Sequence, residues 1–318
     1  MMKFNANQIQ VGISACLVGE KVRFDGGHKQ SRFCVDELSQ YVSYQKVCPE
    51  MAIGMGTPRQ TIRLVDHGKG IRLQASRGHQ DYTDKMLEFS RNFVKNLSHL
   101  SGYVVCAKSP TCGMERVKVY QPQHNMASRD GIGLYTKALM EANPLLPVEE
   151  DGRLNDPVIR ENFITRVFTY HHWQQLVEKG ITRKALFQFH ANHKYLLMAH
   201  EPKMYRELGP LLATFEGDVN ELAQQYITGV MAVLKHNAKR RNHANSLQHI
   251  QGYFKRNLSS IERRQLAESI DKYRQGLLPL LAPITLIKLF LERYPDPYIA
   301  AQVYLNPHPE QLKLRISH

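Results

Sequence analysis

Short apolar runs alternate with polar or glycine-bearing turns over the first half of the chain, a pattern typical of buried β-strands. Three of these runs lie at Ile9–Leu17, Tyr44–Gly54 and Gly102–Pro110. Apolar residues recur every three or four positions over Asp81–Leu97, which predicts a helix with one apolar face. Ile62–Leu73 has Asp-His-Gly-Lys-Gly at its centre and predicts a β-hairpin. The expected fold of this half is α/β, Rossmann-like, with a mostly parallel sheet.

The pattern changes near residue 155. Strand-like alternation stops there, and helical periodicity continues through most of the remaining chain. Pro157 suits the first turn of a helix, and Asn155 or Asp156 before it can cap that helix. We therefore expect two domains, an α/β domain over residues 1–155 and an all-α domain over residues 156–318.

The composition restricts the class of protein further. No apolar run approaches the ~20 residues of a membrane helix. The first residues also lack the order of basic, apolar and small residues that marks a signal peptide, so we expect a cytoplasmic protein with no membrane partner. Lysine and arginine number 42 against 29 aspartate and glutamate, a net charge of +13. Such an excess predicts a polyanionic partner, in particular a nucleic acid; no stable protein partner is predicted.

The five cysteines all precede residue 113, and three of them follow predicted strands. Cys16, Cys48 and Cys112 would converge in one crevice if those strands are parallel neighbours, because open α/β sheets bind ligands at the carboxyl ends of their strands. Three thiolates, rather than four, leave one coordination position open, as in catalytic metal sites. Cys106 lies within a strand-like run, and Cys34 lies in a polar segment that matches no ligand pattern, so both are expected to be small buried residues.

Glycine, proline and other small residues surround the three candidate ligands, which suits backbone that must approach a bulky group closely. The spacing matches neither the compact motifs of ferredoxins nor those of zinc ribbons. From spacing alone, zinc and an iron–sulfur cluster therefore remain equally open, since both accept thiolates.

Three motifs resemble those of the thiouracil desulfidase domain. They are SACL-x-G-x-x-V-R-F-D-G at Cys16, C-P-E followed by G-x-x-x-P-R at Cys48, and K-S-P-T-C-G at Cys112. The helical half is similar to the second domain of YbgA-like proteins, over Phe189–His200, His243–Lys255 and Tyr273–Lys288. For this fused architecture, the resemblance implies removal of sulfur from 4-thiouridine in tRNA, which gives uridine.

The resemblance also implies a cofactor and two catalytic residues. Cys16, Cys48 and Cys112 would bind three irons of a [4Fe-4S] cluster, and the fourth iron would take the sulfur of the substrate. Glu50 and Ser109 match family positions linked to proton transfer or substrate positioning. An under-coordinated iron is a good acceptor for soft thiocarbonyl sulfur without net electron transfer, and a carboxyl group beside it can move the protons of the attacking water.

Other residues of the motifs are weaker candidates. Thr111 stands where serine is frequent and Phe24 where tyrosine is frequent, both mild departures from the family pattern. Lys108 and Arg59 are candidates for contact with the nucleotide or its phosphate, and Asp25 for a hydrogen bond to a ring edge. Each of these three is equally well explained by a structural role.

A basic stretch at residues 235–258 of the helical half predicts contact with tRNA phosphates. Its aromatic residues Tyr253 and Phe254 share helical spacing with apolar neighbours and fit the core better than base stacking. The expected phosphate contacts are Lys239, Arg240, Arg241, Lys255 and Arg256. A second metal site is a weak alternative, since no carboxylate or cysteine completes the set His190, His193, His236 and His243.

Two other functions remain open. One is the desulfidation of free thiouracil. Comparing the turnover of the free base with that of thiolated tRNA would distinguish it from action on tRNA. The other is a non-catalytic, metal-bearing accessory protein of RNA binding or the UV response, whose cysteines hold zinc. Metal analysis would distinguish zinc from iron.

Overall fold

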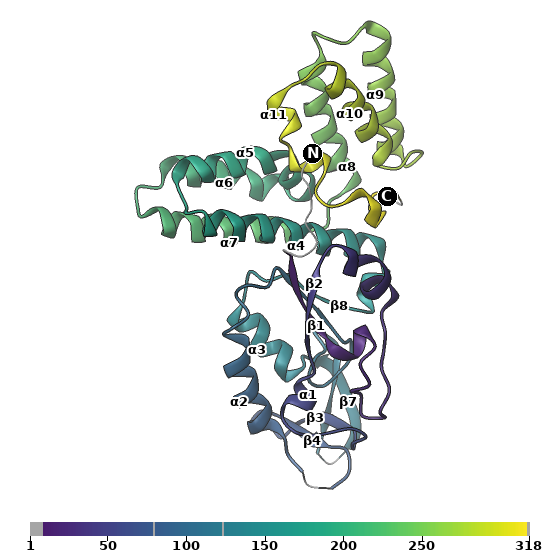
Figure 1. The fold of residues 1–318 in the computed structure, drawn as a ribbon, viewed down its shortest axis with the longest axis vertical. Coiled ribbons are helices and arrows are strands. Elements are labelled where there is room, and N and C mark those ends of the chain that lie inside the picture. The colour runs from purple at the N-terminus through teal and green to yellow at the C-terminus, as the bar shows by residue number, and fades with distance from the viewer. Residues whose placement is uncertain (1–8, 79, 123, 317–318) are drawn as a thin grey trace. The chain divides into compact units, whose positions relative to one another are not determined.

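The computed structural model describes residues 9–78, 80–122 and 124–316 (Figure 1). It divides into two compact units, Met1–Asn155 and Asp156–His318, called here the N-terminal unit and the helical unit. The first combines two small sheets with helices, and the second is helical, which confirms the predicted fold classes. Within the described residues, no helix is long and apolar enough to span a bilayer.

The first sheet of the N-terminal unit is entirely parallel, as the three apolar runs predicted. Its strands are β1 (Gln10–Ser14), β2 (Ser43–Val47), β5 (Gly102–Val105) and β8 (Val148–Glu150), in the order β2-β1-β5-β8. Four of the five residues of β1 and all four of β5 are buried. β1 pairs with β2 on one side and β5 on the other, so three of the strands end side by side.

The second sheet contains the predicted hairpin and two strands that the sequence pattern did not indicate. Its strands are β3 (Ile62–Asp66), β4 (Ile71–Ala75), β6 (Val117–Gln121) and β7 (His124–Gly131), in the order β4-β3-β6-β7. β3 and β4 form the hairpin, while β3 runs parallel to β6 and β6 antiparallel to β7. This sheet is therefore mixed, whereas the first is parallel.

Three α-helices complete the described part of the N-terminal unit: α1 (Pro49–Ala52), α2 (Thr83–Val94) and α3 (Leu134–Ala142). α2 and α3 pack side by side (Figure 1). Met86 and Val94 of α2 are buried, and Phe89 stacks on Phe93 one turn later. The helix expected from this apolar periodicity is confirmed.

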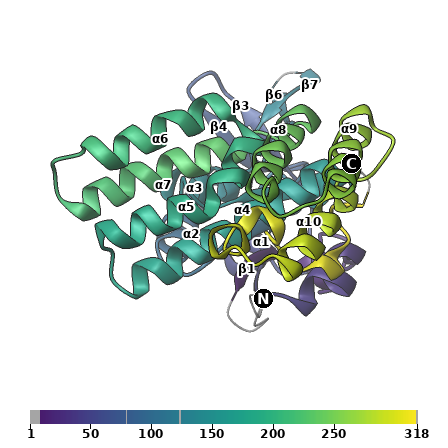
Figure 2. The same ribbon diagram turned by 90° about the horizontal axis from the view of Figure 1, so that it is seen from above.

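The helical unit begins with the predicted cap. The side chain of Asp156 accepts hydrogen bonds from the backbone N–H groups of Val158 and Ile159, and Pro157 occupies the first turn. Figures 1 and 2 show α5, α6 and α7 as long neighbouring helices. The helices are α4 (Pro157–Glu178), α5 (Arg183–His200), α6 (Pro202–Thr214), α7 (Val219–Lys235), α8 (Arg240–Gln251), α9 (Ser260–Gln275), α10 (Leu281–Arg293) and α11 (Pro297–Ala300).

The core of the helical unit holds buried histidines among its aromatic rings. Trp173 of α4 packs edge-on against Phe189 of α5, which stacks on His193. His200, at the end of α5, shares a hydrogen bond between its Nδ1 and the backbone oxygen of His236. Burial lowers the pKa of His193 to about 3 and that of His200 to about 4. These histidines are therefore neutral members of the core at neutral pH.

Candidate active site

The parallel strands β1, β2 and β5 end at a cavity of about 540 Å³ in the N-terminal unit. Cys16 lies in the 3-10 turn that follows β1, Cys48 comes directly after β2, and Cys112 lies in the loop after β5. All three line the cavity. The structure therefore brings together three thiols that are far apart in the sequence, at the edge where α/β sheets bind ligands.

These thiols lie in surroundings that disfavour an uncompensated negative charge. Burial raises the pKa of Cys48 and that of Cys112 above the ordinary value for a thiol. The pKa of Cys16 is raised by a hydrogen bond with the thiol of Cys106 and by burial. A bound metal reverses this preference, because a coordinating thiol loses its proton.

The two remaining cysteines differ from one another. Cys106 is buried, as expected, but it also lines the cavity, and its backbone N–H donates to Oγ of Ser14 at 3.0 Å. Its participation in the cavity wall was not evident from its position within a strand-like run. Cys34 is fully buried and does not line the cavity; its backbone oxygen accepts a hydrogen bond from the Tyr44 hydroxyl.

Glu50 and Ser109 are connected through Thr111. The Thr111 hydroxyl donates to Oε1 of Glu50 at 2.8 Å, and it lies 2.9 Å from the Ser109 hydroxyl. The Ser109 hydroxyl can therefore donate to Thr111, while its oxygen accepts the backbone N–H of Cys112 at 3.1 Å. The result is a chain of hydroxyl groups that ends on a carboxylate beside the thiol-lined cavity.

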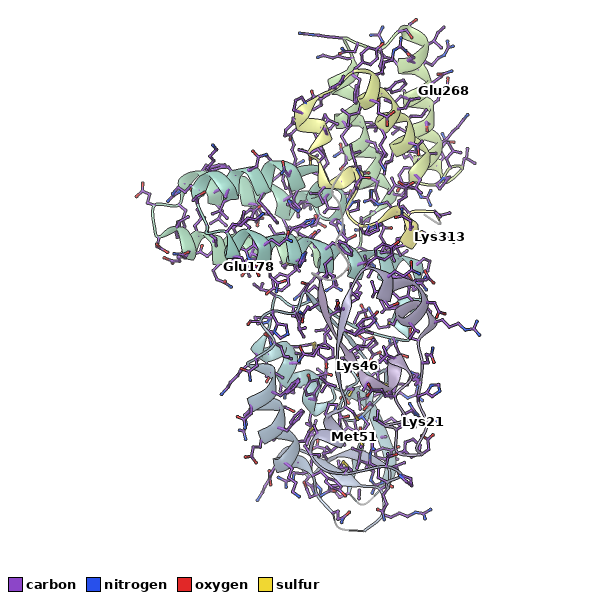
Figure 3. All side chains as sticks on the ribbon, viewed as in Figure 1. Lys21, Lys46, Met51, Glu178, Glu268 and Lys313 are labelled. Atoms are coloured by element: carbon purple, nitrogen blue, oxygen red, sulfur yellow. The ribbon has the colours of Figure 1, made fainter. Side chains whose placement is uncertain are left out.

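Arg59 holds the other oxygen of this carboxylate. Its Nε donates to Oε2 of Glu50 at 3.0 Å and its Nη2 forms an ion pair with the same oxygen. Further bonds run to the backbone oxygens of Gly56 and Val22, and Nη1 lies 3.7 Å from Sδ of Met51, which Figure 3 labels. Because only 5% of the Arg59 side chain is exposed, its main visible role is to position Glu50; contact with a nucleotide stays a prediction.

Asp25 and Lys108 also line the cavity, and both are exposed. Asp25 accepts the backbone N–H of Gly27 within its turn. Lys29 enters the wall as well, in an ion pair of 2.9 Å with Asp151. The structure brings the candidate residues of the three motifs to one place, while their contacts with a substrate remain predictions.

Helix α3 supports the loop that carries Ser109, Thr111 and Cys112. The backbone N–H groups of Leu134 and Tyr135 donate to the oxygens of Pro110 and Thr111, and the hydroxyl of Thr136 donates to the oxygen of Cys112 at 2.7 Å. The amides at the start of a helix have no partner within it, so they are available to bind carbonyl groups. This loop is thus held by a helix that lies outside all three cysteine motifs.

The basic candidates of the helical unit lie at both ends of α8. Four of them are exposed, namely Lys239, Arg241, Lys255 and Arg256. Arg240 differs, because its Nη1 donates to the backbone oxygen of Tyr273 at 2.9 Å and its guanidinium lies over that ring. It therefore has a structural role.

Two of the histidines considered for a second metal site have hydroxyl partners. His190 is 3.2 Å from the Tyr226 hydroxyl, and His243 is 3.0 Å from the Tyr304 hydroxyl. In the part of the chain that the structure describes, no three or more His, Cys, Asp or Glu side chains form a group that could hold a metal ion. The thiols of Cys16, Cys48 and Cys112 are included in that statement, so they do not surround a single ion as they stand.

Comparisons with known proteins identify the class. Residues 11–151 match the family model for 2-thiouracil desulfurase, and residues 194–309 match a protein family of unknown function, DUF1722. The N-terminal unit therefore carries a desulfidase-family domain, as the three motifs indicated. The uncharacterized protein YbgA of Escherichia coli (strain K12) is 39% identical over 159 residues, which are 49% of this chain and 94% of YbgA. The chain belongs to the YbgA family and joins a 2-thiouracil desulfurase domain to it.

A solved structure is also similar to part of the chain. It is that of the [4Fe-4S]-dependent thiouracil desulfidase TudS, with 24% sequence identity and a TM-score of 0.37. The match covers 46% of this chain and 94% of TudS.

Proposed function

We propose that the chain is an iron–sulfur-dependent desulfidase that converts 4-thiouridine in tRNA to uridine and releases sulfide. One observation carries the proposal: the chain of hydrogen bonds from Ser109 through Thr111 to Glu50 runs beside a cavity lined by Cys16, Cys48 and Cys112. Thiols supply metal ligands, and the carboxylate supplies proton transfer. The match to the 2-thiouracil desulfurase family supports the same chemistry.

The residues present fit a [4Fe-4S] cluster. Cys16, Cys48 and Cys112 would hold it, since thiolates are the usual ligands of such clusters and the cavity of about 540 Å³ is far larger than a single ion. When bound, the cluster supplies an iron without a protein ligand, a soft Lewis acid suited to thiocarbonyl sulfur.

The protein's own groups manage water and protons. In the net reaction, the oxygen of water replaces sulfur at C4 of the ring. The carbon–sulfur bond breaks and sulfur leaves as hydrogen sulfide, and nothing is oxidised or reduced. Glu50 accepts a proton from the water, directly or through the hydroxyl groups of Thr111 and Ser109. Arg59 keeps the carboxylate oriented by binding the oxygen that Thr111 does not.

The tRNA substrate rests on the fused architecture and on the positive charge of the chain, +13 in total. The second candidate, desulfidation of free thiouracil, is favoured by the description of the matched family. Both candidate reactions use the same cavity, so they differ only in the molecule that carries the thiolated base into it.

An anaerobic assay decides between them. Protein purified without oxygen is analysed for iron, sulfide and zinc and then offered thiolated tRNA or free 2-thiouracil at equal concentrations. The proposal expects iron and sulfide in the protein and a much higher kcat/KM for the tRNA. Zinc without iron would support the accessory-protein alternative, and preferred turnover of the free base would assign the smaller substrate.

A further inference from the structure

A second hollow of about 1140 Å³ opens beside the thiol-lined cavity, entirely within the N-terminal unit. The two share part of their walls, so the second, called here the basic groove, continues from the first. The residues that line both are Thr61, Ile62, Ala107, Lys108 and Pro110. A free pyrimidine base needs only the smaller space, because pockets of ~300–1,000 Å³ already enclose most of a drug-sized ligand. The desulfidation chemistry therefore leaves the groove unexplained.

The lining of the groove is strongly cationic. Its two carboxyl groups have partners: Glu150 accepts the backbone N–H groups of Met114 and Glu115, and Glu115 forms ion pairs with Arg116 and Arg153. The six cationic side chains that line it are Arg63, Lys108, Arg116, Lys118, Arg129 and Arg153. Positive charge thus exceeds negative charge in a concave surface, where the field of such charges is concentrated.

The register of the second sheet places some of these cations together. β3 and β6 pair Leu64 with Val119, and both of these side chains are buried. Side chains alternate between the two faces of a strand, so the preceding residues, Arg63 and Lys118, share the opposite face. Arg63 lies with its guanidinium 5.2 Å from the centre of the Tyr120 ring.

Three of these cations form no ion pair with an acidic residue in the part of the chain described. Nε of Arg63 is buried without a hydrogen-bond partner there. Lys118 and Arg129 are exposed, and no ion pair with a described acidic residue engages either of them. Cations that satisfy no acidic group of the protein are available to an anionic ligand.

Two more of the groove's cations have an unusual backbone conformation. Lys108 has φ of 63° and Arg116 has φ of 54°, in the left-handed region that side chains other than glycine rarely adopt. Lys108 lies where the cavity and the groove meet. An unfavourable backbone conformation at two basic positions of the same wall agrees with a role in binding.

From this arrangement we infer that the basic groove binds the sugar–phosphate backbone of the RNA strand on either side of the nucleotide whose base enters the thiol-lined cavity. The inference rests on the proposed function, which it deepens by placing an RNA contact in the N-terminal unit. A nucleotide in a folded RNA must leave its stack to reach a buried reactive centre. Cations next to the cavity would hold the displaced strand by its phosphates, independently of sequence.

The test compares two charge reversals in full-length protein purified with its metal. Lys118→Glu/Arg129→Glu changes the groove, and Lys85→Glu/Lys95→Glu makes the same change in net charge at exposed positions near and in α2. Binding of tRNA is measured by fluorescence anisotropy at about 50 and 200 mM salt. The groove variant should bind at least ~30-fold more weakly at the lower salt, with a log–log salt slope smaller by about 2. The control should lose less than ~3-fold.

The outcomes separate this inference from the proposed function, because binding is measured without turnover. Equal losses in the two variants, or no binding of tRNA by the parent, would overturn the groove assignment. The groove assignment would also be overturned if the groove variant lost the parent's binding to anionic phospholipid vesicles but kept its tRNA affinity. That result would assign the groove to a membrane surface. If the groove variant alone loses tRNA but the parent leaves 4-thiouridine intact, the groove binds RNA and the proposed reaction is wrong.

Discussion

The two units bury ionisable groups in different ways. In the N-terminal unit, the thiols of Cys16 and Cys112 and the carboxylate of Glu50 border a cavity that opens to solvent. In the helical unit, His193 lies inside a packed core, where it stacks on Phe189 and has a backbone partner. Burial shifts pKa values in both units. A shifted pKa therefore indicates a functional site only where the group also faces space that a ligand can occupy.

The largest effect expected in the N-terminal unit comes from its cysteines. Cys48→Ser should abolish the cluster and with it all measurable turnover, because one of three anchors is lost. Cys34→Ser is the matched control, since that thiol is buried away from the cavity. Iron and sulfide content and visible absorption after anaerobic purification give the result. A Cys48→Ser protein with full iron content and activity would remove Cys48 from the ligand set.

Glu50→Gln should retain the cluster and lose about 10²–10⁴-fold in kcat. The amide keeps the shape of the side chain but cannot exchange the proton, and it removes the negative charge that pairs with Arg59. Iron content measured on the same sample separates a catalytic loss from a loss of cofactor. Thr111→Ser serves as the control, because it keeps the hydroxyl that bonds to Glu50. If the kcat of Glu50→Gln equals that of the parent protein at every pH, Glu50 is excluded from proton transfer.

The helical unit should instead respond to acid through its stability. His200 has a folded-state pKa of about 4, below the ordinary 6.5. Above pH 6.5 both folded and unfolded states are neutral; as the pH falls from 6.5 to 4, only the unfolded chain takes up the proton. Stability is therefore lost through this window, by at most about 3 kcal/mol for this residue.

The single tryptophan of the chain, Trp173 in α4, makes this effect measurable. Denaturant unfolding followed by its fluorescence at pH 7 and pH 4.5 should show a smaller pH dependence in His200→Asn, whose amide can still donate to the oxygen of His236. His249→Asn, at an exposed position, should behave as the parent does. Equal pH dependence in all three proteins would contradict the assignment to His200.

The smallest effect is expected from the exposed cations beside α8. Lys239→Ala/Arg241→Ala should weaken tRNA binding about threefold and reduce the salt slope by up to 2, since each neutralised phosphate releases counterions. Arg240 is left in place because it binds the backbone of Tyr273. Lys184→Ala/Lys203→Ala removes the same charge elsewhere in the helical unit. Equal affinities for both variants at low and high salt would exclude this surface from RNA binding.

Much of the fold follows from local patterns. The two buried runs that contain β1 and β5, the hairpin of β3 and β4, and the Asp156 cap were all predicted, because each depends on residues close together in sequence. β6 and β7 were not predicted. β7, with the sequence HNMASRDG, has little of the apolar alternation that marks a strand and is held by pairing with β6.

The same distinction applies to the site. That the cysteines meet at one cavity could be anticipated from their positions at strand ends. The bond between Thr111 and Glu50 could not, because it joins residues 61 positions apart and depends on how two loops pack. The hydrogen bond between Cys16 and Cys106 likewise depends on the pairing of β1 with β5. Sequence indicated which groups are present, whereas packing decides which of them interact.

The close packing of the Thr111–Cys112 loop against the start of α3 affects which related sequences can be expected to have the same activity. A Cβ atom added at Gly133 would lie 2.5 Å from the backbone oxygen of Thr111 and 2.8 Å from the nitrogen of Cys112. Any larger residue there would displace the loop, although Gly133 belongs to none of the three motifs. A homologue could thus retain every cysteine and still have lost the reaction. When this activity is assigned to a homologous sequence, a glycine at this position should therefore be required in addition to the three motifs.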